Sequence, residues 1–567
     1  MVHFEEDNPD DLLGNMVVLG VSLIVIAAVV IGVVAGIDHD DAPLKPEKMT
    51  LDAICDLTDY KESCMASLQP VGNYAQVITY FRAAVNATIS EMALAMKKAK
   101  VDADAVRDDH GSTETTMAFE DCIELIGLCI EELQSVLTMV NATPNLFFKD
   151  SGDARSSLSA VLSYQRACLE GLKESRSTSD MDRGLQKPSE LASNALAIIY
   201  EHSENDDLEA DHSIPNWGTG TTDNDGMIYP DRLSAADRKL LHYSYKKGGQ
   251  MMTPHAVVAK DGSGQYASIA AALNAYPIAH KGRYLIYVRS GVYEENVIIS
   301  KNITQIFMYG DGVNRTVISG RDFNGTTYRR ASLSVIGNGF ICKDIGIKIP
   351  DKSRGNSMAA VKIQSDSAAF FHCRINGSTT SSISALAHRQ FFIDCEIYGV
   401  TNIIRGDAAV VIQRSKIIVT QETVPVSANI IALQGRSDKR ESTGFVIHGC
   451  TIEPDKSSTV SGVLENSAYL GMAVEKYSRT IVMESSLEDI IHPDGWYNNN
   501  NYGIETVTFA EYRNKGPGAG TSKRVKWPGY SVINNRSDAL RYTAGRFIEA
   551  QNWLQGTQVP LQAGLFS

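Results

Sequence analysis

A repeat of short apolar runs in the second half of the chain limits its possible folds more than any other feature. The runs that end at Ile375, Ile397, Ile417 and Ile452 are rich in Ile, Val and Phe, and Gly, Asn, Asp and Ser turns divide them. Their closing residues step by 22, 20 and 35 positions, which indicates a repeat of about 20 residues with one long insertion. Because a strand module of this period cannot bury its apolar face alone, modules must stack into a solenoid. The sequence therefore predicts a parallel β-helix. The alternative, a β-sandwich, would need hairpin turns that are sparse here.

A helical pattern precedes these strands. Residues 50–205 are dominated by Ala, Leu, Met, Glu and Lys, and their apolar residues recur at spacings of three and four, as in an amphipathic helix. Several such helices without strands predict an all-α bundle. Residues 206–250 then accumulate Pro, Gly, Asn, Asp and Thr, which is typical of a linker. The β-helix is expected over residues 255–560.

The cysteines of the predicted bundle can form two disulfide bonds. Cys55 and Cys64 can join a short hairpin and Cys122 and Cys168 two long helices, which leaves Cys129 as the odd residue. The alternative is that Cys122, Cys129 and Cys168 are reduced core residues. The sequence assigns no pairing to the remaining cysteines, which are Cys129, Cys342, Cys373, Cys395 and Cys450.

The N-terminal region predicts entry into the secretory pathway. An acidic tail, residues 1–15, precedes an uninterrupted apolar stretch over residues 16–37, which at about 1.5 Å per residue can cross a bilayer core of about 30 Å. We expect a signal anchor rather than a cleaved signal peptide, because acidic residues stand where a basic n-region would be. Lys45 and Lys48 follow the stretch, so charge alone does not fix its orientation.

N-glycosylation sequons support the same destination, and the secretory lumen also permits disulfides. The sequon asparagines are Asn86, Asn141, Asn302, Asn314, Asn324, Asn376 and Asn535.

The net charge of -14 conceals segments of opposite sign. Residues 1–43 carry -8 and residues 44–241 carry -15, whereas residues 242–567 carry +9. A basic β-helix suits a polyanionic partner, although the same charge can simply serve solvation. Within the linker, Arg238, Lys239, Leu240 and Leu241 form a basic tetrapeptide of the kind that processing proteases cut.

Several stretches of the second half resemble the plant pectin methylesterases. They are AVVAKDGSGQYASIAAALNAYP at 256–277, YLIYVRSGVYEENV at 284–297, MYGDG at 308–312, RQFFIDCEIYG at 389–399 and EYRNKGPGAGTSKRVKWPGY at 511–530. The region 50–205 resembles the invertase and pectin methylesterase inhibitor domain that precedes the enzyme in members with a pro-region. The pairs Cys55/Cys64 and Cys122/Cys168 match the two disulfides of that domain. The Arg-Lys-Leu-Leu site matches the place where the pro-region is removed.

This resemblance implies a four-helix bundle followed by a right-handed parallel β-helix that hydrolyses methyl esters of homogalacturonan pectin in the cell wall. The family mechanism uses an Asp nucleophile, a second Asp as general acid and base, two oxyanion Gln side chains and an orienting Arg. These are the groups that ester hydrolysis needs. No metal or organic cofactor is required, and nucleic acid is not an expected partner. The expected partners are pectin, other pectin methylesterases through the bundle, and a processing protease.

The catalytic positions depart from the family pattern. Asn402 stands where the nucleophile is expected, and Arg405 replaces an aromatic ring that normally stacks. A neutral carboxamide cannot act as the expected carboxylate nucleophile. Met472 replaces the orienting Arg and Val474 the substrate-stacking Trp.

The acid and oxyanion positions are changed as well. Ser357 replaces the first oxyanion Gln. The second falls at Thr379 or Thr380 and the general acid at Thr380 or Ser381, because the interval is one residue longer than usual. The sequence therefore predicts a pseudoenzyme that binds pectin with absent or residual esterase activity. The alternatives are an active esterase and an inhibitor that acts through the bundle. The nearest remaining acids in sequence are Asp366, Asp394 and Asp407, for which surface or turn roles are expected.

Overall fold

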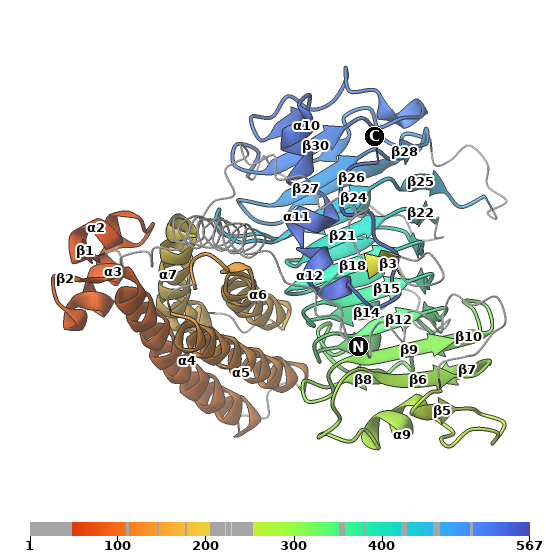
Figure 1. Ribbon diagram of the computed structural model, residues 1–567, viewed down its shortest axis with the longest axis horizontal. Coiled ribbons are helices and arrows are strands. Elements are labelled where there is room, and N and C mark those ends of the chain that lie inside the picture. The colour runs from red at the N-terminus through yellow and green to blue at the C-terminus, as the bar shows by residue number, and fades with distance from the viewer. Residues whose placement is uncertain are drawn as a thin grey trace, which may run out of the picture.

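The computed structural model describes residues 48–108, 113–144, 147–175, 179–203, 221–222, 228–229, 253–350, 358–377, 381–420, 428–456, 465–498 and 503–566. These residues form a helical bundle and a β-helix that lie side by side (Figure 1). The predicted tail and apolar stretch at 1–37 and the processing site at 238–241 lie outside the described residues. Within the described part of the chain, no helix is long and apolar enough to cross a membrane.

Four long helices form the bundle. They are α4 (Val77–Asp108), α5 (Thr113–Ala142), α6 (Gly152–Glu174) and α7 (Ser179–His202). A small unit precedes them, made of β1 (Lys48–Thr50), α2 (Leu51–Asp56), α3 (Lys61–Leu68), a 3-10 turn (Gln69–Val71) and β2 (Tyr74–Gln76). The apolar residues at helical spacing on α5, such as Leu125, Ile126 and Leu133, are buried in one shared core. The predicted bundle is confirmed.

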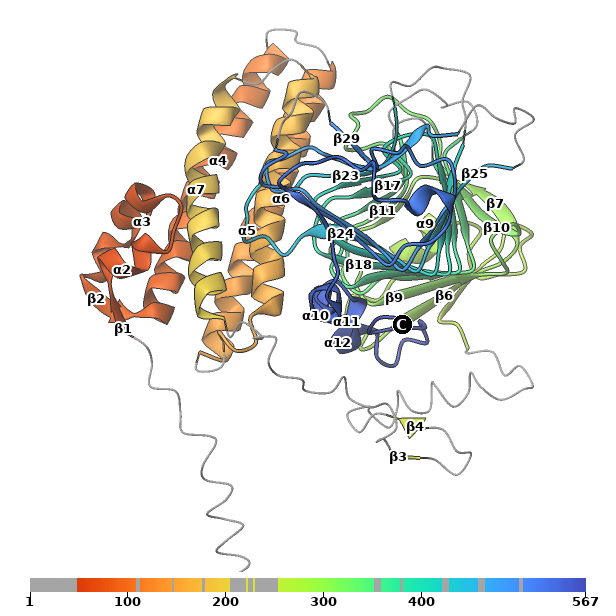
Figure 2. The same ribbon diagram turned by 90° about the horizontal axis from the view of Figure 1, so that it is seen from above.

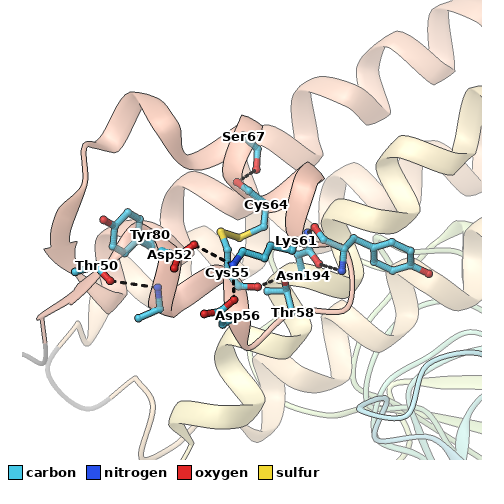
Figure 3. Close-up of a disulfide and its surroundings, with 12 residues drawn as sticks. Thr50, Asp52, Cys55, Asp56, Thr58, Lys61, Cys64, Ser67, Tyr80 and Asn194 are labelled. Atoms are coloured by element: carbon cyan, nitrogen blue, oxygen red, sulfur yellow. Dashed lines mark hydrogen bonds and ion pairs between the residues drawn. A yellow bond between two sulfur atoms is a disulfide. The ribbon is translucent and has the colours of Figure 1, made fainter.

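Two disulfides join the cysteine pairs that the family resemblance indicated. Cys55–Cys64 links α2 to α3, and Cys122–Cys168 links α5 to α6. Figure 3 shows the first of these and the amide of Asn194, which reaches from α7 to the turn between α2 and α3. That amide accepts a hydrogen bond from the Tyr60 backbone N–H at 3.3 Å and donates one to the Tyr60 carbonyl at 3.0 Å. The small unit is therefore tied to the bundle by side-chain hydrogen bonds, including those of Asn194, as well as by its core.

Removing the Cys55–Cys64 disulfide should destabilise the bundle without affecting the β-helix. The bond closes a short loop, with a sequence separation of 9, for which the constraint on the unfolded chain corresponds to about 2–3 kcal/mol. In calorimetry of the full chain, Cys55→Ala/Cys64→Ala should lower the bundle transition and leave the β-helix transition in place. Either single variant should cost at least as much as the double. An unchanged bundle transition would contradict the expectation.

Three parallel sheets form the β-helix (Figure 2). The sheet that faces the bundle, called here the bundle-facing sheet, contains β8 (Val297–Ile299), β11 (Ala331–Val335), β14 (Ala359–Ile363), β17 (Ile383–Ala385), β20 (Ile404–Gly406), β23 (Asn429–Gln434), β26 (Ala468–Ala473) and β29 (Trp496–Tyr497). A second eight-stranded sheet contains β7 (Gly291–Glu294), β10 (Thr316–Ser319), β13 (Gly346–Lys348), β16 (Arg374–Asn376), β19 (Glu396–Gly399), β22 (Lys416–Val419), β25 (Thr451–Pro454) and β28 (Ser486–Leu487).

The third sheet has eleven strands. They are β5 (Ala256–Val258), β6 (Tyr284–Val288), β9 (Ile306–Gly310), β12 (Ile341–Lys343), β15 (Ala368–Phe371), β18 (Arg389–Ile393), β21 (Ala409–Gln413), β24 (Gly444–His448), β27 (Arg479–Met483), β30 (Thr508–Tyr512) and β31 (Tyr530–Val532). Helix α9 (Ile269–Asn274) packs at the N-terminal end of the solenoid. The helices α10 (Arg536–Leu540), α11 (Ala544–Phe547) and α12 (Ala550–Leu554) pack on the outer face of the eleven-stranded sheet. In the sequence between the bundle and the β-helix, β3 (Thr221–Thr222) pairs antiparallel with β4 (Ile228–Tyr229).

The register of the β-helix confirms the repeat found in the sequence. Ile375, Ile397, Ile417 and Ile452 are consecutive ladder partners in the second sheet, and each of their side chains is 0% exposed. The stacked residues thus form one continuous column of the solenoid core, as a module that buries its apolar face against its neighbours requires.

Free cysteines also lie in the two cores. Cys129 is buried in the bundle, and Cys342, Cys373, Cys395 and Cys450 are buried in the β-helix. Burial raises the pKa of the Cys129 and Cys373 thiols, so these groups are neutral at physiological pH.

Candidate functional site

One outward-facing column of the bundle-facing sheet carries two of the site positions predicted from the sequence, Arg405 and Met472. Ladder pairing places Lys362 beside Ser384, Ser384 beside Arg405, Arg405 beside Leu433, and Leu433 beside Met472. Apolar residues that flank them in the same strands, such as Val361, Ile383, Ile404 and Ala432, belong to the solenoid core, because side chains alternate across a strand. Arg405 and Met472 therefore stand on the same outer face, two coils apart.

The other predicted site residues lie around this column. Ser381 lies two residues before the start of β17 and is 4% exposed, and its hydroxyl has no hydrogen-bond partner among the described residues. Asn402 lies just before β20 with a positive φ of 50°. Val474 follows β26, and its N–H donates to the Gln434 carbonyl at 3.1 Å. Three further predicted positions lie outside the part of the chain that the structure describes, namely Ser357, Thr379 and Thr380.

Asp407 was expected to have a surface or turn role. It does lie in the turn between β20 and β21, but it is only 1% exposed. Its carboxylate accepts hydrogen bonds from Gln434 Nε2 at 3.1 Å and Thr443 Oγ1 at 2.6 Å within the β-helix. From α6, Ser163 Oγ donates to it at 2.7 Å and Arg166 Nη2 lies 2.7 Å away. Asp407 thus has a turn position, one of the two roles expected, but it does not lie at the surface, because the bundle covers this turn.

A second buried carboxyl group, Glu441, contacts Asp407. Burial and the negative charge of Asp407 raise the pKa of Glu441 well above its ordinary value. Its Oε1 accepts hydrogen bonds from Ser437 Oγ at 2.9 Å and from the Asp438 N–H at 3.2 Å. Glu441 therefore keeps its proton to a higher pH than an ordinary glutamate, and Asp407 Oδ2 faces Arg166 Nη2 at 2.7 Å.

The remaining candidate acids are held in structural contacts. The carboxylate of Asp366 accepts hydrogen bonds from Arg389 Nε at 3.0 Å and from Arg389 Nη2 at 2.7 Å. Burial alone would raise the pKa of Asp366, but the Arg389 guanidinium outweighs it and the pKa is lowered. Asp394 occupies an exposed turn with φ of 53° and forms a two-point ion pair with Arg414 at 3.0 and 2.7 Å. Asp394 therefore has the turn role that was expected.

The bundle covers this face of the β-helix mainly with α5 and α6 (Figure 2). In most of the ion pairs between the two bodies, the bundle supplies the acid and the β-helix the base. They are Glu132–Lys301 (2.8 Å), Glu120–Arg329 (3.0 Å), Asp121–Arg329, Asp153–Arg389 (2.6 Å), Asp59–Arg440 (2.9 Å) and Asp59–Lys439 (2.8 Å). Arg166–Asp407 has the opposite polarity.

A small cavity of about 50 Å³ remains between α6 and the outer column, and we call it the interface pocket. Lys362, Ser381, Ser384 and Arg405 line it from the β-helix. The lining residues of α6 are Ala167, Glu170, Gly171 and Glu174, and those of the segment before β11 are Thr327 and Tyr328. Among the lining residues, the carboxylates come from α6 and the cations from the β-helix.

Met472 does not join this pocket. It lines a separate hollow of about 10 Å³ with Tyr497 and Trp527. The structure therefore brings Ser381 and Arg405 together in the interface pocket. Asn402 lies just before the strand that carries Arg405, and Met472 lines the separate hollow. Sequence reasoning missed the contribution of α6. The only signal available was the spacing of Arg166, Glu170 and Glu174, four residues apart on one helix face.

Comparisons with known proteins show the family to which the sequence and fold of this chain are related. The family model for plant invertase/pectin methylesterase inhibitor matches residues 49–198, and the model for pectinesterase matches residues 255–551. Probable pectinesterase/pectinesterase inhibitor 13 of Arabidopsis thaliana is 33% identical over 534 residues, which cover 91% of this chain and 82% of that protein. Pectinesterase 1 of Citrus sinensis is 31% identical over 551 residues, which cover 94% and 92%.

A solved structure supports the same relationship. The pectin methylesterase from carrot is 35% identical and matches 56% of this chain and 100% of its own, with a TM-score of 0.52. An inhibitor-type helical bundle followed by a parallel β-helix defines the class of two-part pectinesterases. The chain belongs to the pectinesterase family, and it carries the inhibitor domain ahead of the esterase domain.

Proposed function

We propose that this protein binds homogalacturonan pectin through its β-helix and hydrolyses pectin methyl esters weakly or not at all. The observation that carries the proposal is Asn402, a carboxamide at the position of the family nucleophile. Met472 at the orienting-Arg position and Ser381 near the general-acid position support it. The loss of one acid or one oxyanion donor typically lowers a rate by about 10²–10⁴, and the loss of a nucleophile typically lowers it further.

The nearby carboxylates do not offer an evident replacement. Asp407 is buried and bound by Arg166, and the raised pKa of Glu441 beside it favours the protonated form of that carboxyl group. Asp366 is bound by Arg389. A nucleophile must be free to reach the ester carbonyl, and these groups are committed to other partners.

Methanol release from highly methyl-esterified pectin tests the proposal. The full chain, before and after cleavage in the 206–250 segment, should release methanol at least about 10³-fold more slowly than an active plant esterase. Asn402→Asp alone should restore little, because the acid and the orienting Arg are still absent. Rapid release that is abolished by Asp407→Asn or Asp366→Asn would instead establish an active esterase with a relocated carboxylate.

Inhibition of other pectin methylesterases through the bundle is a second candidate function. The observation that favours it is the set of acidic side chains with which the bundle already holds the β-helix of its own chain. Residues 44–241 mixed with an active plant esterase should lower its rate of methanol release. No loss of rate at micromolar bundle would count against this function.

Delivery to the cell wall is part of the proposal. All seven sequon asparagines are exposed in the structure, which supports N-glycosylation of a secreted protein. We further propose that residues 16–37 anchor the precursor in the membrane and that a protease cuts at 238–241, separating residues 50–205 from residues 255–560. Treatment of the plant-expressed protein with an N-glycosidase should lower its apparent mass, and an unchanged mass would contradict this assignment.

A further inference from the structure

The interface pocket contains a buried cation that contacts no carboxylate of the described residues. Lys362 is 7% exposed, and its ammonium donates to the Tyr328 carbonyl at 2.8 Å and lies 3.7 Å from the centre of the Tyr328 ring. Burial lowers the pKa of Lys362 to about 8. A buried ammonium with only neutral neighbours in contact is less stable than one that faces an anion. The site is therefore suited to binding an anion.

Arg405 provides a second cation two coils further along the same column. Its side chain is 26% exposed, and its contact with Glu170 of α6 is loose, with Nη2 and Oε2 3.9 Å apart. Glu170 also lies 3.6 Å from Arg166 Nε of its own helix. A guanidinium suits a carboxylate in a two-point geometry, which this distance does not provide. Arg405 is thus incompletely paired when the bundle is docked.

Ser381 adds a neutral hydrogen-bonding group. Its hydroxyl is buried, lines the same pocket and has no partner within the part of the chain that the structure describes. Buried hydroxyls are normally satisfied, so this one can serve a ligand that brings its own donors and acceptors. The two cations can bind the carboxylate of a uronic acid, and the unpaired hydroxyl can hydrogen-bond one of its hydroxyl groups. All three groups line the same pocket on the outer face of the bundle-facing sheet.

We propose that Lys362, Ser381 and Arg405 form a subsite for the free carboxylate of a uronate in de-esterified pectin, and that Glu170 blocks this subsite while the bundle is docked. The inference rests on the proposed function, since it names the form of pectin that is bound. A methyl ester carries no negative charge and cannot form an ion pair with Arg405. The subsite therefore favours pectin from which methyl groups have already been removed by an esterase.

Competition between oligogalacturonates and the bundle tests the proposal on the intact protein. A protease recognition sequence is inserted in the 206–250 segment, the full chain is folded, and the segment is cut. Release of the bundle is then followed at fixed ionic strength with added oligogalacturonate or its fully methyl-esterified form. The free acid should release the bundle at a concentration at least about 10-fold lower, since a charge-assisted contact contributes about 1.5–3 kcal/mol.

Matched variants assign the effect to the subsite. Arg405→Met should reduce the preference for the free acid, whereas Lys416→Met, which removes an exposed cation of the second sheet, should preserve it. Glu170→Gln should weaken docking in the wild-type background but have no further effect in the Arg405→Met background.

Each other outcome overturns the inference. Equal competition by the two oligomers, no competition by either, or an undiminished preference in Arg405→Met would each contradict it. These failures are distinguishable from failure of the proposed function, which is measured by methanol release and by binding of pectin of any degree of esterification.

Discussion

Arg166→Met should weaken docking of the bundle on the β-helix by about 3–5 kcal/mol, the usual cost of removing one partner from a buried ion pair. Arg166 Nη2 lies 2.7 Å from Asp407, and the two side chains are 14% and 1% exposed. After the substitution, the Asp407 carboxylate stays buried under α6 without its cation. In the cut chain, the dissociation constant of the two bodies should rise by about 10²–10⁴-fold.

Two controls separate this effect from a general loss of charge. Lys439→Met removes an exposed pair with Asp59, whose side chains are 48% and 38% exposed, and such pairs contribute only about 0–1 kcal/mol. Asp407→Asn in the Arg166→Met background removes the orphan carboxylate and should recover part of the loss. A dissociation constant for Arg166→Met no higher than that for Lys439→Met would contradict the assigned role.

The architecture could be predicted from the sequence because it depends on periodic patterns. The column of Ile375, Ile397, Ile417 and Ile452 gives the repeat of the β-helix, and the spacing of Leu125, Ile126 and Leu133 gives a helix of the bundle. In each case, the residues that pack together recur at a period set by backbone geometry. Local pattern is sufficient for these elements.

The environment of the site could not be predicted in the same way. Ser163 contacts Asp407 across 244 sequence positions, and no periodicity links two such residues. The sequence left a surface role and a turn role open for Asp407. The residue lies in a turn, and its burial depends on α6 of the bundle. The resemblance to the family could suggest which positions to examine, whereas the part of the bundle that covers them required the structure.

The docked bundle also changes how the charge imbalance is understood. The +9 of residues 242–567 suggested a polyanionic partner, and several of these basic residues, among them Arg329, Arg389 and Arg440, in fact bind acids of the bundle. The acidic segment 44–241, with its charge of -15, thus neutralises basic residues of the β-helix that a polyanionic ligand could otherwise bind. Removal of the bundle would return these cations to solvent, where a polyuronate can reach them.

Glu441→Gln should remove a pH-dependent loss of stability from the β-helix. Because the pKa of Glu441 is raised in the folded protein, the unfolded chain loses this proton near the ordinary glutamate pKa of 4.5 while the folded protein retains it. Above that pH the unfolded state binds fewer protons, so stability falls by about 1.4 kcal/mol per pH unit until the folded pKa is reached. Glutamine has the shape of the protonated acid and does not titrate.

Urea unfolding of the β-helix at a series of pH values from 4 to 8 measures this difference. Wild type and Glu441→Gln should be similar near pH 4, and the variant should become progressively more stable as the pH rises, since all other titrating groups are common to both. In an Asp407→Asn background the difference should shrink, because the negative charge of Asp407 helps to raise the pKa of Glu441. Parallel pH profiles for wild type and Glu441→Gln would mean that the pKa of Glu441 is not raised in the folded protein, and the expectation would fail.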